Sequence, residues 1–408
     1  MTETNPNIDF PTEIIEEGKV KILVPKLKAF IKLPSDYAPS KAPVFYNPVM
    51  ELNRDIAVLA LQTYQKMLNL EISVCEPLAS CGIRGIRFAT EVKGVQKVLI
   101  NDINEKAFQL ARYNVHMNRL SKRVTVKNQD ANFFLAHYGA PSKRFDAIDI
   151  DPFGSPVPYL DSAIRALRNG GLLALTATDM APLCGVHPKA CIRKYGGKPL
   201  RTEYCHELAV RLLAGCLVTT AAKYDIGISV VFSHSTNHYI RIYATTKYGA
   251  KKADESIKNM GYILHCFNCF HRETTKELFT IEHSRKCSEC GSKMSTAGPL
   301  RLGKIYDKKF CELMEEEAKQ RKFRLKNRIG KILTLIKSEV EAPITYYVVD
   351  KLCDALTVPV PSVKKVIETL RNEGFPASLT HFNTEGIKSN APATKMKEIL
   401  QEITSAKR

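Results

Sequence analysis

The sequence predicts an α/β fold, in which an open, parallel sheet is followed by a smaller domain of mixed α and β structure. Between about residues 70 and 245, short apolar runs alternate with helical patterns, which is typical of a sheet covered by helices on both faces. After residues 247–253 paired cysteines and a basic run replace that alternation. A chain of 408 residues, 44% of them hydrophobic, is long enough to bury two cores. We therefore expect domains at residues 1–248 and 249–408.

Four short apolar segments of the first domain are predicted to be strands of the sheet. A helix is predicted after the second strand, because a polar side chain at residues 102–104 can cap it and apolar residues then recur at helical spacing. A longer helical stretch is predicted at residues 202–223. The predicted strands are 72–75, 98–101, 147–150 and 172–178, and the recurring apolar residues are Ala107, Leu110, Ala111 and Val115.

Two β-rich runs at residues 226–233 and 239–246 are close enough for a hairpin, which departs from simple βα alternation. In the second domain, short helical patterns lie around residues 343–356 and 362–372. Gly374 is placed to end the latter helix, because glycine tolerates the left-handed conformation found at many helix ends. The second domain is therefore expected to be small and rich in helices.

The balance of charge favours a polyanionic partner. Sixty Lys and Arg residues against 42 Asp and Glu residues give a formal net charge of +18. Such an excess attracts nucleic acid by electrostatics alone, although a basic surface that only keeps a protein soluble is the simpler alternative. No obligatory protein partner is predicted.

The composition also bears on location. The segment at residues 1–9 is polar and not Arg-rich, so neither a secretory signal nor a transit peptide is expected. No uninterrupted run of roughly eighteen apolar residues occurs, so no membrane span is expected. Twelve cysteines without a signal sequence fit a reducing compartment, where thiols stay free or bind metal. The cytoplasm is the expected location.

A turn with two glycines follows the first predicted strand and points to a nucleoside-containing cofactor. Residues 76–85 read Glu-Pro-Leu-Ala-Ser-Cys-Gly-Ile-Arg-Gly, and Asp102 follows Gly82 by twenty residues at the end of the second strand. Glycines let the backbone approach a ligand, and a carboxylate in this position can accept hydrogen bonds from ribose hydroxyls. The first glycine of the GxGxxG pattern is missing, which disfavours NAD. S-adenosylmethionine has no phosphate, so a looser turn suffices.

Two further segments are candidates for the same cofactor. Asp130, within Gln-Asp-Ala at residues 129–131, follows an apolar run and could reach the adenine amino group. Arg54 opens an amphipathic stretch at residues 56–67 and could hold the methionine carboxylate through two hydrogen bonds. Each alone would be an ordinary surface charge, so their value lies in their order along the chain.

The segment Asp-Pro-Phe-Gly-Ser-Pro at residues 151–156 follows the third strand and carries candidate catalytic groups. An aromatic amine needs an acceptor for its N–H groups when it attacks a methyl sulfonium, and Asp151 with the Pro152 carbonyl can provide one. Phe153 offers a face on which a purine can stack. A plain Pro-Gly turn is the structural alternative, but it does not explain three aspartates near a buried strand.

Two cysteine pairs in the second domain predict a zinc site. Each pair has the Cys-x-x-Cys spacing, and seventeen residues separate the pairs, as in tetrahedral four-cysteine sites. Four thiolates leave no open coordination position, so the zinc would be structural. Four unrelated free thiols are the alternative, and nearby histidines could replace a cysteine. The predicted ligands are Cys266, Cys269, Cys287 and Cys290, and the histidines are His265, His271 and His283.

A basic run follows, without an acid through Lys337. We expect it on a helix, where the charges would cover more than one face and could follow the phosphates of a curved RNA. A solvated helix is the alternative. The run consists of Lys319, Arg321, Lys322, Arg324, Lys326, Arg328 and Lys331.

Taken together, these motifs resemble the tRNA guanine-26 N2,N2-dimethyltransferases of archaea and eukaryotes, over nearly the whole chain. The resemblance also includes Gly-Pro-Leu at residues 298–300 and His-Phe at 381–382. Arg301 follows Gly-Pro-Leu where the family often has tryptophan, a difference that concerns the second domain. The motifs that carry the resemblance are Phe-Tyr-Asn-Pro at 45–48, Asn-Arg-Asp at 53–55, Gly-Ile-Arg-Gly at 82–85, residues 151–156, Thr-Ala-Thr-Asp at 176–179, Ala-Pro-Leu-Cys-Gly at 181–185 and Ala-Lys-Tyr-Asp at 222–225.

The resemblance implies a class I, Rossmann-like methyltransferase fold with a zinc-containing, tRNA-binding C-terminal domain. It implies dimethylation of the exocyclic N2 of guanine 26 in tRNA. The implied residue roles are Arg54, Arg84, Asp102, Asp130 and Ala131 for binding S-adenosylmethionine, Asp151 as catalytic acceptor, and Phe45 with Phe153 around the base.

Other classes share only part of these features. A nucleotide-dependent oxidoreductase would share the sheet and Asp102 but not Asp-Pro-Phe. A non-catalytic zinc and RNA-binding protein would share the cysteines but not the cofactor turn. Within the methyltransferases, another RNA guanine-N2 or nucleic-acid amino-methyltransferase stays open, as does a mono- rather than dimethylated product.

Overall fold

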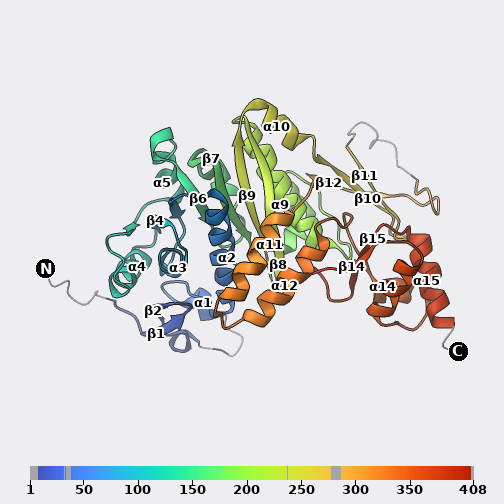
Figure 1. The fold of residues 1–408 in the computed structure, drawn as a ribbon, viewed down its shortest axis with the longest axis horizontal. Coiled ribbons are helices and arrows are strands. Elements are labelled where there is room, and N and C mark those ends of the chain that lie inside the picture. Colours follow the sequence, from blue (N-terminus) through green and yellow to red (C-terminus); the bar gives the residue numbers. More distant parts are fainter. Residues whose placement is uncertain (1–7, 32, 34–37, 237, 277–285, 406–408) are drawn as a thin grey trace.

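The computed structural model describes residues 8–31, 33, 38–236, 238–276 and 286–405. Its largest sheet has the strand order β5-β4-β3-β6-β7-β9-β8, in which β9 runs antiparallel to both neighbours and the other neighbouring pairs are parallel (Figure 1). The expected open α/β sheet, including the hairpin, is confirmed. The strands are β3 (Ile72–Glu76), β4 (Val95–Asn101), β5 (Val124–Lys127), β6 (Phe145–Ile150), β7 (Leu167–Ala177), β8 (Ile226–Thr236) and β9 (Tyr239–Tyr248).

The strand order reverses beside β3. The chain passes from β3 to β4 and β5 on one side and returns to β6 on the other side. In open α/β sheets, ligands bind outside the carboxyl ends of the strands at such a reversal. The carboxyl ends of β3, β4, β5 and β6 are therefore the edge at which a site is expected.

β7 begins five residues earlier than the predicted strand. Leu167 already pairs with Phe145, and the register then shifts before Leu172 pairs with Ala147. None of the intervening residues 168–171 has an apolar side chain, and one of them, Gly170, has a φ of +81°. Apolar periodicity cannot detect such a segment, because pairing with β6 holds it in the sheet.

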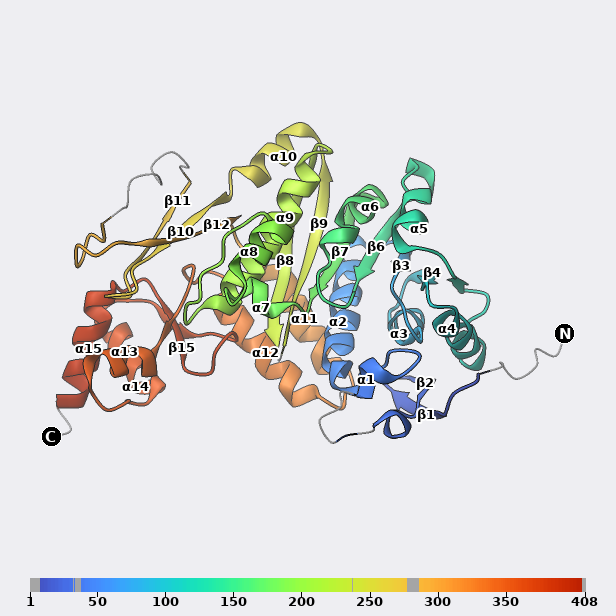
Figure 2. The same ribbon diagram turned by 180° about the vertical axis from the view of Figure 1, so that it is seen from behind.

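Helices cover both faces of the sheet. α2 (Glu51–Leu68), α3 (Ile83–Glu91) and α4 (Glu105–Met117) follow one another on one face, where α2 is in front in Figure 1. α5 (Ala131–His137), α6 (Leu160–Arg165) and α9 (Cys205–Ala222) lie on the other face, where α9 is in front in Figure 2. The predicted start of α4 is confirmed, because the side chain of Asn104 accepts a hydrogen bond from Lys106 N.

By length and hydropathy, α9 is the one helix in the described part of the chain that could cross a membrane. However, 72% of it is buried inside the protein, where it packs on β8, β9 and β12 (Ser295–Arg301). Its apolar composition is therefore explained by its place in the core.

An N-terminal hairpin, which the sequence pattern did not predict, packs against the helices beside the cofactor turn. It consists of β1 (Thr12–Glu17) and β2 (Val20–Pro25). The side chain of Asn114 in α4 binds both backbone polar groups of Leu23 in β2, because it accepts from Leu23 N and donates to Leu23 O. These two hydrogen bonds attach the N-terminal hairpin to α4, the helix that follows β4 at the edge where the site is expected.

The chain beyond β9 forms two further sheets and several helices. β10 (Met260–His265) lies between β11 (Arg272–Thr275) and β12, and β15 (Gly386–Ser389) lies between β13 (Tyr347–Val348) and β14 (Ala377–Leu379). All these pairs are antiparallel, which agrees with the expected mixed α and β structure. The helices beyond β9 are α10 (Ala250–Ile257), α11 (Lys308–Gln320), α12 (Lys326–Glu339), α13 (Val349–Leu356), α14 (Val363–Asn372) and α15 (Ala393–Ser405). Earlier in the chain lie the short helices α1 (Ala38–Lys41), α7 (Met180–Leu183) and α8 (Pro188–Tyr195).

The basic run is not one helix, contrary to the prediction. α11 ends at Gln320, α12 begins at Lys326, and the residues between them are not helical. Arg321 pairs with Glu317 and donates to Glu91 O, while Arg324 pairs with Glu51 of α2. Two of the seven cations therefore hold α11 and α12 to the sheet domain, where α11 lies along α2 (Figure 1).

The two C-terminal helical patterns are confirmed, with one shorter than expected. α13 begins at Val349 rather than near residue 343, because Tyr347 and Val348 pair with β15. α14 begins after Ser362, whose hydroxyl accepts from Lys365 N, and ends before Gly374, whose φ is +83°. These helices and α15 have a core of their own, whereas one larger core extends from β2 through the sheet to α12. The domain boundary at residue 248 falls between β9 and α10 and stays a prediction.

Gly85→Ala is expected to destabilise the protein, because a Cβ atom there would lie 2.3 Å from Cγ2 of Ile100 and 3.0 Å from Oε2 of Glu76. Such overpacking typically costs about 1–3 kcal/mol. Urea denaturation measures the change. Gly330→Ala in α12 is the matched control: no atom lies within 4 Å of its Cβ position, so it should be neutral or stabilising by up to about 1 kcal/mol. Equal effects of the two substitutions would contradict the packing described here.

Candidate active site

The turn after β3 lies close against β4. Ala79 N donates to Asn101 O at 2.9 Å, Ser80 has a φ of +48° and Gly82 a φ of +78°. The left-handed backbone of Gly82 favours glycine, and a Cβ atom there would lie 2.9 Å from Cδ1 of Ile100, which would have to shift. The backbone of the predicted glycine turn thus lies directly against the carboxyl end of β4.

Asp102 lies at the end of β4 and fixes two turns. Its Oδ2 accepts from Ser80 N at 2.7 Å, and its Oδ1 accepts from Asn104 N at 2.9 Å. Burial raises the pKa of Asp102, although the two backbone N–H groups oppose this effect. Each carboxylate oxygen has two lone pairs, so both can accept a further hydrogen bond from a ligand hydroxyl.

Arg84 is buried and joins three segments of the site. Its Nη1 donates to Oδ1 of Asn53 at 2.8 Å, and its Nη2 pairs with Oδ2 of Asp151. Its Nε lies 3.4 Å from Oε1 of Glu76 and 3.7 Å from Oδ1 of Asp149. The residues predicted from α2, from the glycine turn and from the end of β6 therefore meet at one guanidinium.

Arg54 is buried and paired with a residue that the sequence analysis missed. Its Nε and Nη2 each donate to a carboxylate oxygen of Glu17 at 2.6 Å, and Nη2 also donates to Asn47 O at 3.2 Å. Its guanidinium carbon lies 5.5 Å from the centre of the Tyr46 ring. A ligand carboxylate would have to approach Nη1 or displace Glu17. No local pattern identifies Glu17, because the pairing depends on the N-terminal hairpin.

Asp130 and Ala131 begin α5 beside the end of β4. The side chain of Asp130 accepts from Phe133 N at 2.9 Å and so caps the helix, while Ala131 is buried. Nδ2 of Asn101 donates to Gln129 O at 2.9 Å and ties this loop to the strand that carries Asp102. The capping bond uses Oδ1 of Asp130, so the other carboxylate oxygen can accept a hydrogen bond from a ligand.

Phe45 and Phe153 meet beside the carboxyl end of β6. Their ring centres lie 4.5 Å apart with the planes at 88°, an edge-to-face contact. Ser80 Oγ donates to Phe45 O at 2.5 Å, which ties this pair to the cofactor turn. Phe153 is 73% exposed, an unusual position for a phenylalanine in a structured loop. Gly154 N and Thr178 Oγ1 are 2.8 Å apart, so the end of β7 holds the loop from behind.

The three aspartates of the β6 segment have different partners. Asp146 accepts from Ser73 and Arg168 at the start of the strand, and Asp149 pairs with the buried Arg241. Only Asp151 lies at the carboxyl edge. All three were expected to favour a functional site, but Asp146 joins β6 to β3 and β7. Asp149 joins β6 to Arg241 of β9, two strands away, and its Oδ1 also lies 3.7 Å from Nε of Arg84.

Asp151 is held in its ionised form. Burial alone would raise its pKa, but the guanidinium of Arg84 and then that of Arg241 outweigh burial, and the pKa lies below its ordinary value. The carboxylate therefore accepts hydrogen bonds at neutral pH and binds a proton only weakly. Its suitable role is to orient an N–H group and to stabilise the positive charge that develops on an attacking amine.

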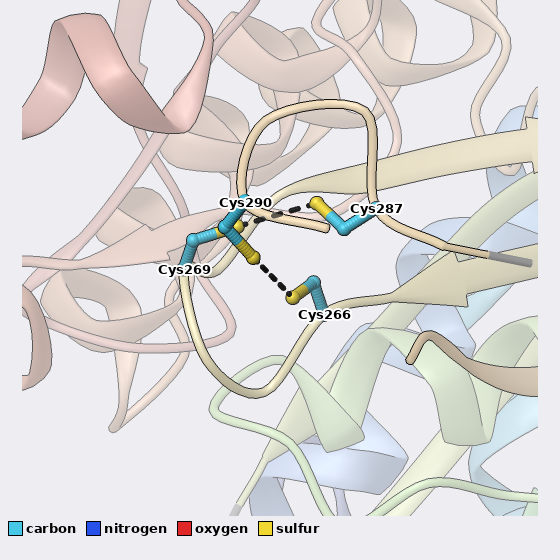
Figure 3. A group of neighbouring side chains, drawn as sticks. All are labelled: Cys266, Cys269, Cys287 and Cys290. Atoms are coloured by element: carbon cyan, nitrogen blue, oxygen red, sulfur yellow. Dashed lines mark hydrogen bonds between the residues drawn. The ribbon is translucent and has the colours of Figure 1, made fainter. Parts of the chain in front are cut away.

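The four predicted cysteine ligands come together at two matching turns (Figure 3). Sγ of Cys266 lies 3.5 Å from Sγ of Cys290, and Sγ of Cys269 lies 3.4 Å from Sγ of Cys287. The first cysteine of each turn donates its N–H five residues ahead, Cys266 to His271 O and Cys287 to Ser292 O. The two Cys-x-x-Cys motifs thus have the same backbone geometry.

Two of the neighbouring histidines, His271 and His265, are not part of this sulfur cluster. Nδ1 of His271 lies 2.9 Å from Glu289 and its Nε2 lies 2.9 Å from Glu273, so both nitrogens have partners. His265 is buried among aromatic rings and does not belong to the group of sulfur atoms. His283 lies outside the described residues. Four sulfur atoms within 4.8 Å of one another match the donor set of a tetrahedral zinc ion.

The chain is similar to known proteins over nearly its whole length. A family model described as N2,N2-dimethylguanosine tRNA methyltransferase matches residues 18–401. A Methanobrevibacter smithii protein named tRNA (guanine(26)-N(2))-dimethyltransferase is 46% identical, over 98% of this chain and 99% of that protein. An Aquifex aeolicus protein named tRNA (guanine(26)-N(2)/guanine(27)-N(2))-dimethyltransferase is 37% identical, over 96% of each chain.

A solved structure extends this similarity to the fold. The structure of Trm1 from Pyrococcus horikoshii in complex with S-adenosyl-L-methionine has a TM-score of 0.82 and is 36% identical, over 95% of this chain and 99% of that one. The sheet and the residues at its carboxyl edge therefore belong to a Rossmann-like methyltransferase fold, and the chain is a member of the N2,N2-dimethylguanosine tRNA methyltransferase family.

Proposed function

We propose that this enzyme transfers methyl groups from S-adenosylmethionine to the exocyclic N2 of guanine 26 in tRNA and forms the dimethylated product. The observation that carries the proposal is the geometry at the carboxyl end of β6, where the Asp151 carboxylate pairs with Arg84 and the rings of Phe45 and Phe153 meet edge to face. Relatives at 46% and 37% identity carry the corresponding names and support the substrate.

The cofactor is proposed to bind along the turns after β3, β4 and β5. Asp102 offers carboxylate lone pairs to ribose hydroxyls, and Asp130 with Ala131 lies where the adenine would be held. Arg54 and Arg84 supply positive charge for the methionine carboxylate. When bound, S-adenosylmethionine supplies an electrophilic methyl group on a sulfonium.

The residues of the chain then supply alignment rather than strong base catalysis. The lone pair of a guanine amino group is delocalised into the ring, so the amine must be turned toward the methyl group before it can attack. Asp151 accepts an N–H bond of that amine, and the exposed ring of Phe153 offers a stacking surface for the flipped base. For a second transfer, the monomethylated amine would present its remaining N–H to the same carboxylate.

We further propose a structural zinc ion at Cys266, Cys269, Cys287 and Cys290, within a C-terminal tRNA-binding domain at residues 249–408. Four thiolates fill a tetrahedral shell, so this ion would brace the two turns rather than take part in chemistry. Several cations of the basic run lie exposed at the α11–α12 junction and can contact phosphates. They include Lys319, Lys322, Lys326 and Lys331.

Asp151→Asn is expected to reduce methylation of unmodified tRNA by at least about 100-fold, because the amide cannot hold the N–H group as a charged acceptor does. Nucleoside analysis should find N2,N2-dimethylguanosine with the wild-type protein. Binding of S-adenosylmethionine, measured by calorimetry, should be retained. The control Asp161→Asn alters an exposed ion pair on α6 and should leave the rate unchanged. A variant at position 151 with full activity would refute the assignment.

Phe153→Ala is expected to lower kcat/KM for tRNA by roughly 5- to 150-fold, which corresponds to the loss of about 1–3 kcal/mol of base stacking. The dissociation constant for S-adenosylmethionine should stay the same, since the exposed ring lies on the base side. Phe153→Tyr keeps an aromatic face and should retain most activity. Equal losses in the Ala and Tyr variants would show that the position serves another purpose.

The buried carboxyl of Glu76 predicts a dependence of stability on pH. Burial raises the pKa of Glu76 from 4.5 to about 8. The charge of Arg84 opposes this effect, whereas the charges of Asp149 and Asp151 add to it. At pH values between 4.5 and about 8, the folded protein holds a proton that the unfolded chain has released. The free energy of unfolding should therefore fall as pH rises from about 5 to about 8, by at most about 1.4 kcal/mol per pH unit.

Glu76→Gln removes this titration and tests the effect. Urea denaturation without cofactor at several pH values should give a shallower decline for the variant than for the wild type between pH 5 and 8. The contribution of Glu76 is complete at acidic pH, so the two proteins should differ most in the alkaline part of the range. Parallel curves over the whole range would show that Glu76 is ionised in the folded protein.

A further inference from the structure

A second group of metal-ligating atoms lies apart from the four-cysteine cluster and takes no part in the proposed methyl transfer. Sγ of Cys184, Sγ of Cys205 and an imidazole nitrogen of His206 all lie within 4.8 Å of one another. Cys184 follows α7, whereas Cys205 and His206 are the first two residues of α9. Twenty residues of chain separate the two thiols, so the fold and not the local sequence brings them together.

The backbone holds these three residues close. Gly185, with a φ of +87°, follows Cys184 and turns the chain against the segment that leads to α9. A Cβ atom at Gly185 would lie 2.7 Å from Arg201 N and 2.8 Å from the carbonyl carbon of Leu200, so only glycine allows this approach. The backbone that carries Cys184 is therefore held against the segment that leads to α9.

We infer that Cys184, Cys205 and His206 form a second metal site, which binds Zn²⁺ through two thiolates and one imidazole. Tetrahedral Zn²⁺ with bonds of about 2.0–2.3 Å needs donor atoms roughly 3.4–3.8 Å apart, which small side-chain rotations can reach from the observed spacing. Sulfur and imidazole donors select zinc over magnesium or calcium. The fourth coordination position is left for water or another small ligand.

The surroundings of His206 fit this role. A backbone group of Phe382, in the loop between β14 and β15, faces the His206 imidazole and favours its protonated form. A ligating histidine commonly engages a backbone group with its second ring nitrogen, because the outer hydrogen bond fixes the ring orientation. All three metal-ligating groups thus come from the segment that runs from the end of α7 to the start of α9, and Phe382 approaches the imidazole from the C-terminal part of the chain.

An ion at this position would brace the chain behind the catalytic loop. Thr178, two residues before α7, exchanges hydrogen bonds with Gly154: Gly154 N donates to Thr178 Oγ1, and Thr178 N donates to Gly154 O at 2.9 Å. Gly154 directly follows Phe153. The metal would fix the junction of α7 and α9 that anchors this loop, so its loss should affect tRNA methylation more than cofactor binding.

Metal content measures the site directly. The full-length protein is stripped with a chelator, reloaded with excess Zn²⁺, desalted and analysed by mass spectrometry. We expect two zinc ions per wild-type chain, one per chain in Cys184→Ser/Cys205→Ser, and one per chain in Cys287→Ser/Cys290→Ser. Cys216→Ser, the same change at a different cysteine of α9, is the matched control and should keep both ions.

Alkylation of the wild-type protein gives an independent measurement if a variant fails to fold. Cys184 and Cys205 should react with N-ethylmaleimide in the stripped protein and be protected after Zn²⁺ is added, as peptide mass spectrometry can show. Cobalt substitution should add the absorption bands of a mixed sulfur and nitrogen site to those of the four-sulfur site. One zinc ion per wild-type chain with unprotected thiols, or a disulfide between Cys184 and Cys205, would overturn the inference.

Discussion

The pairing of the buried Arg84 guanidinium is the constraint on which the site depends. A buried charge is costly unless carboxylates and hydrogen-bond acceptors surround it, so the chain must bring several segments to this one group. Arg84 meets Asn53 from α2, Glu76 from β3 and Asp151 from the end of β6. These contacts fix the distance between the glycine turn and the proposed catalytic carboxylate. The charge of Arg84, followed by that of Arg241, also lowers the pKa of that carboxylate against the effect of burial.

A second charged network links the N-terminal hairpin to the same edge. Arg87 is fully buried and pairs with Glu17, Asp55 and Glu91, while Glu17 also holds Arg54. Because removal of one partner from a buried network leaves an uncompensated charge, the hairpin is coupled to the cofactor turn although it lies outside the sheet. Arg54, one of the two arginines proposed to bind the methionine carboxylate, is therefore positioned by Glu17 of β1.

A buried ion pair also joins α9, which covers the large sheet, to β15 in the C-terminal part of the chain. Lys388 of β15 donates to Glu207 of α9 at 2.7 Å and to Pro343 O at 3.0 Å, with less than a tenth of either charged side chain exposed. α11 packs along α2 in addition. The proposed tRNA-binding part is thus held at a defined position relative to Phe153, which lets phosphate contacts far from the target base contribute to its placement.

The sequence by itself determined the features that are local. Apolar periodicity located β3, β4 and β6, a short polar side chain marked the start of α4, Gly374 marked the end of α14, and cysteine spacing indicated the sulfur cluster. Only the tertiary structure decided which of the β6 aspartates lies at the edge, that Glu17 holds Arg54, and that the basic run breaks between α11 and α12. The physical reason is that periodicity and capping act within one or two turns of chain, whereas a buried ion pair depends on groups that only the folded chain brings together.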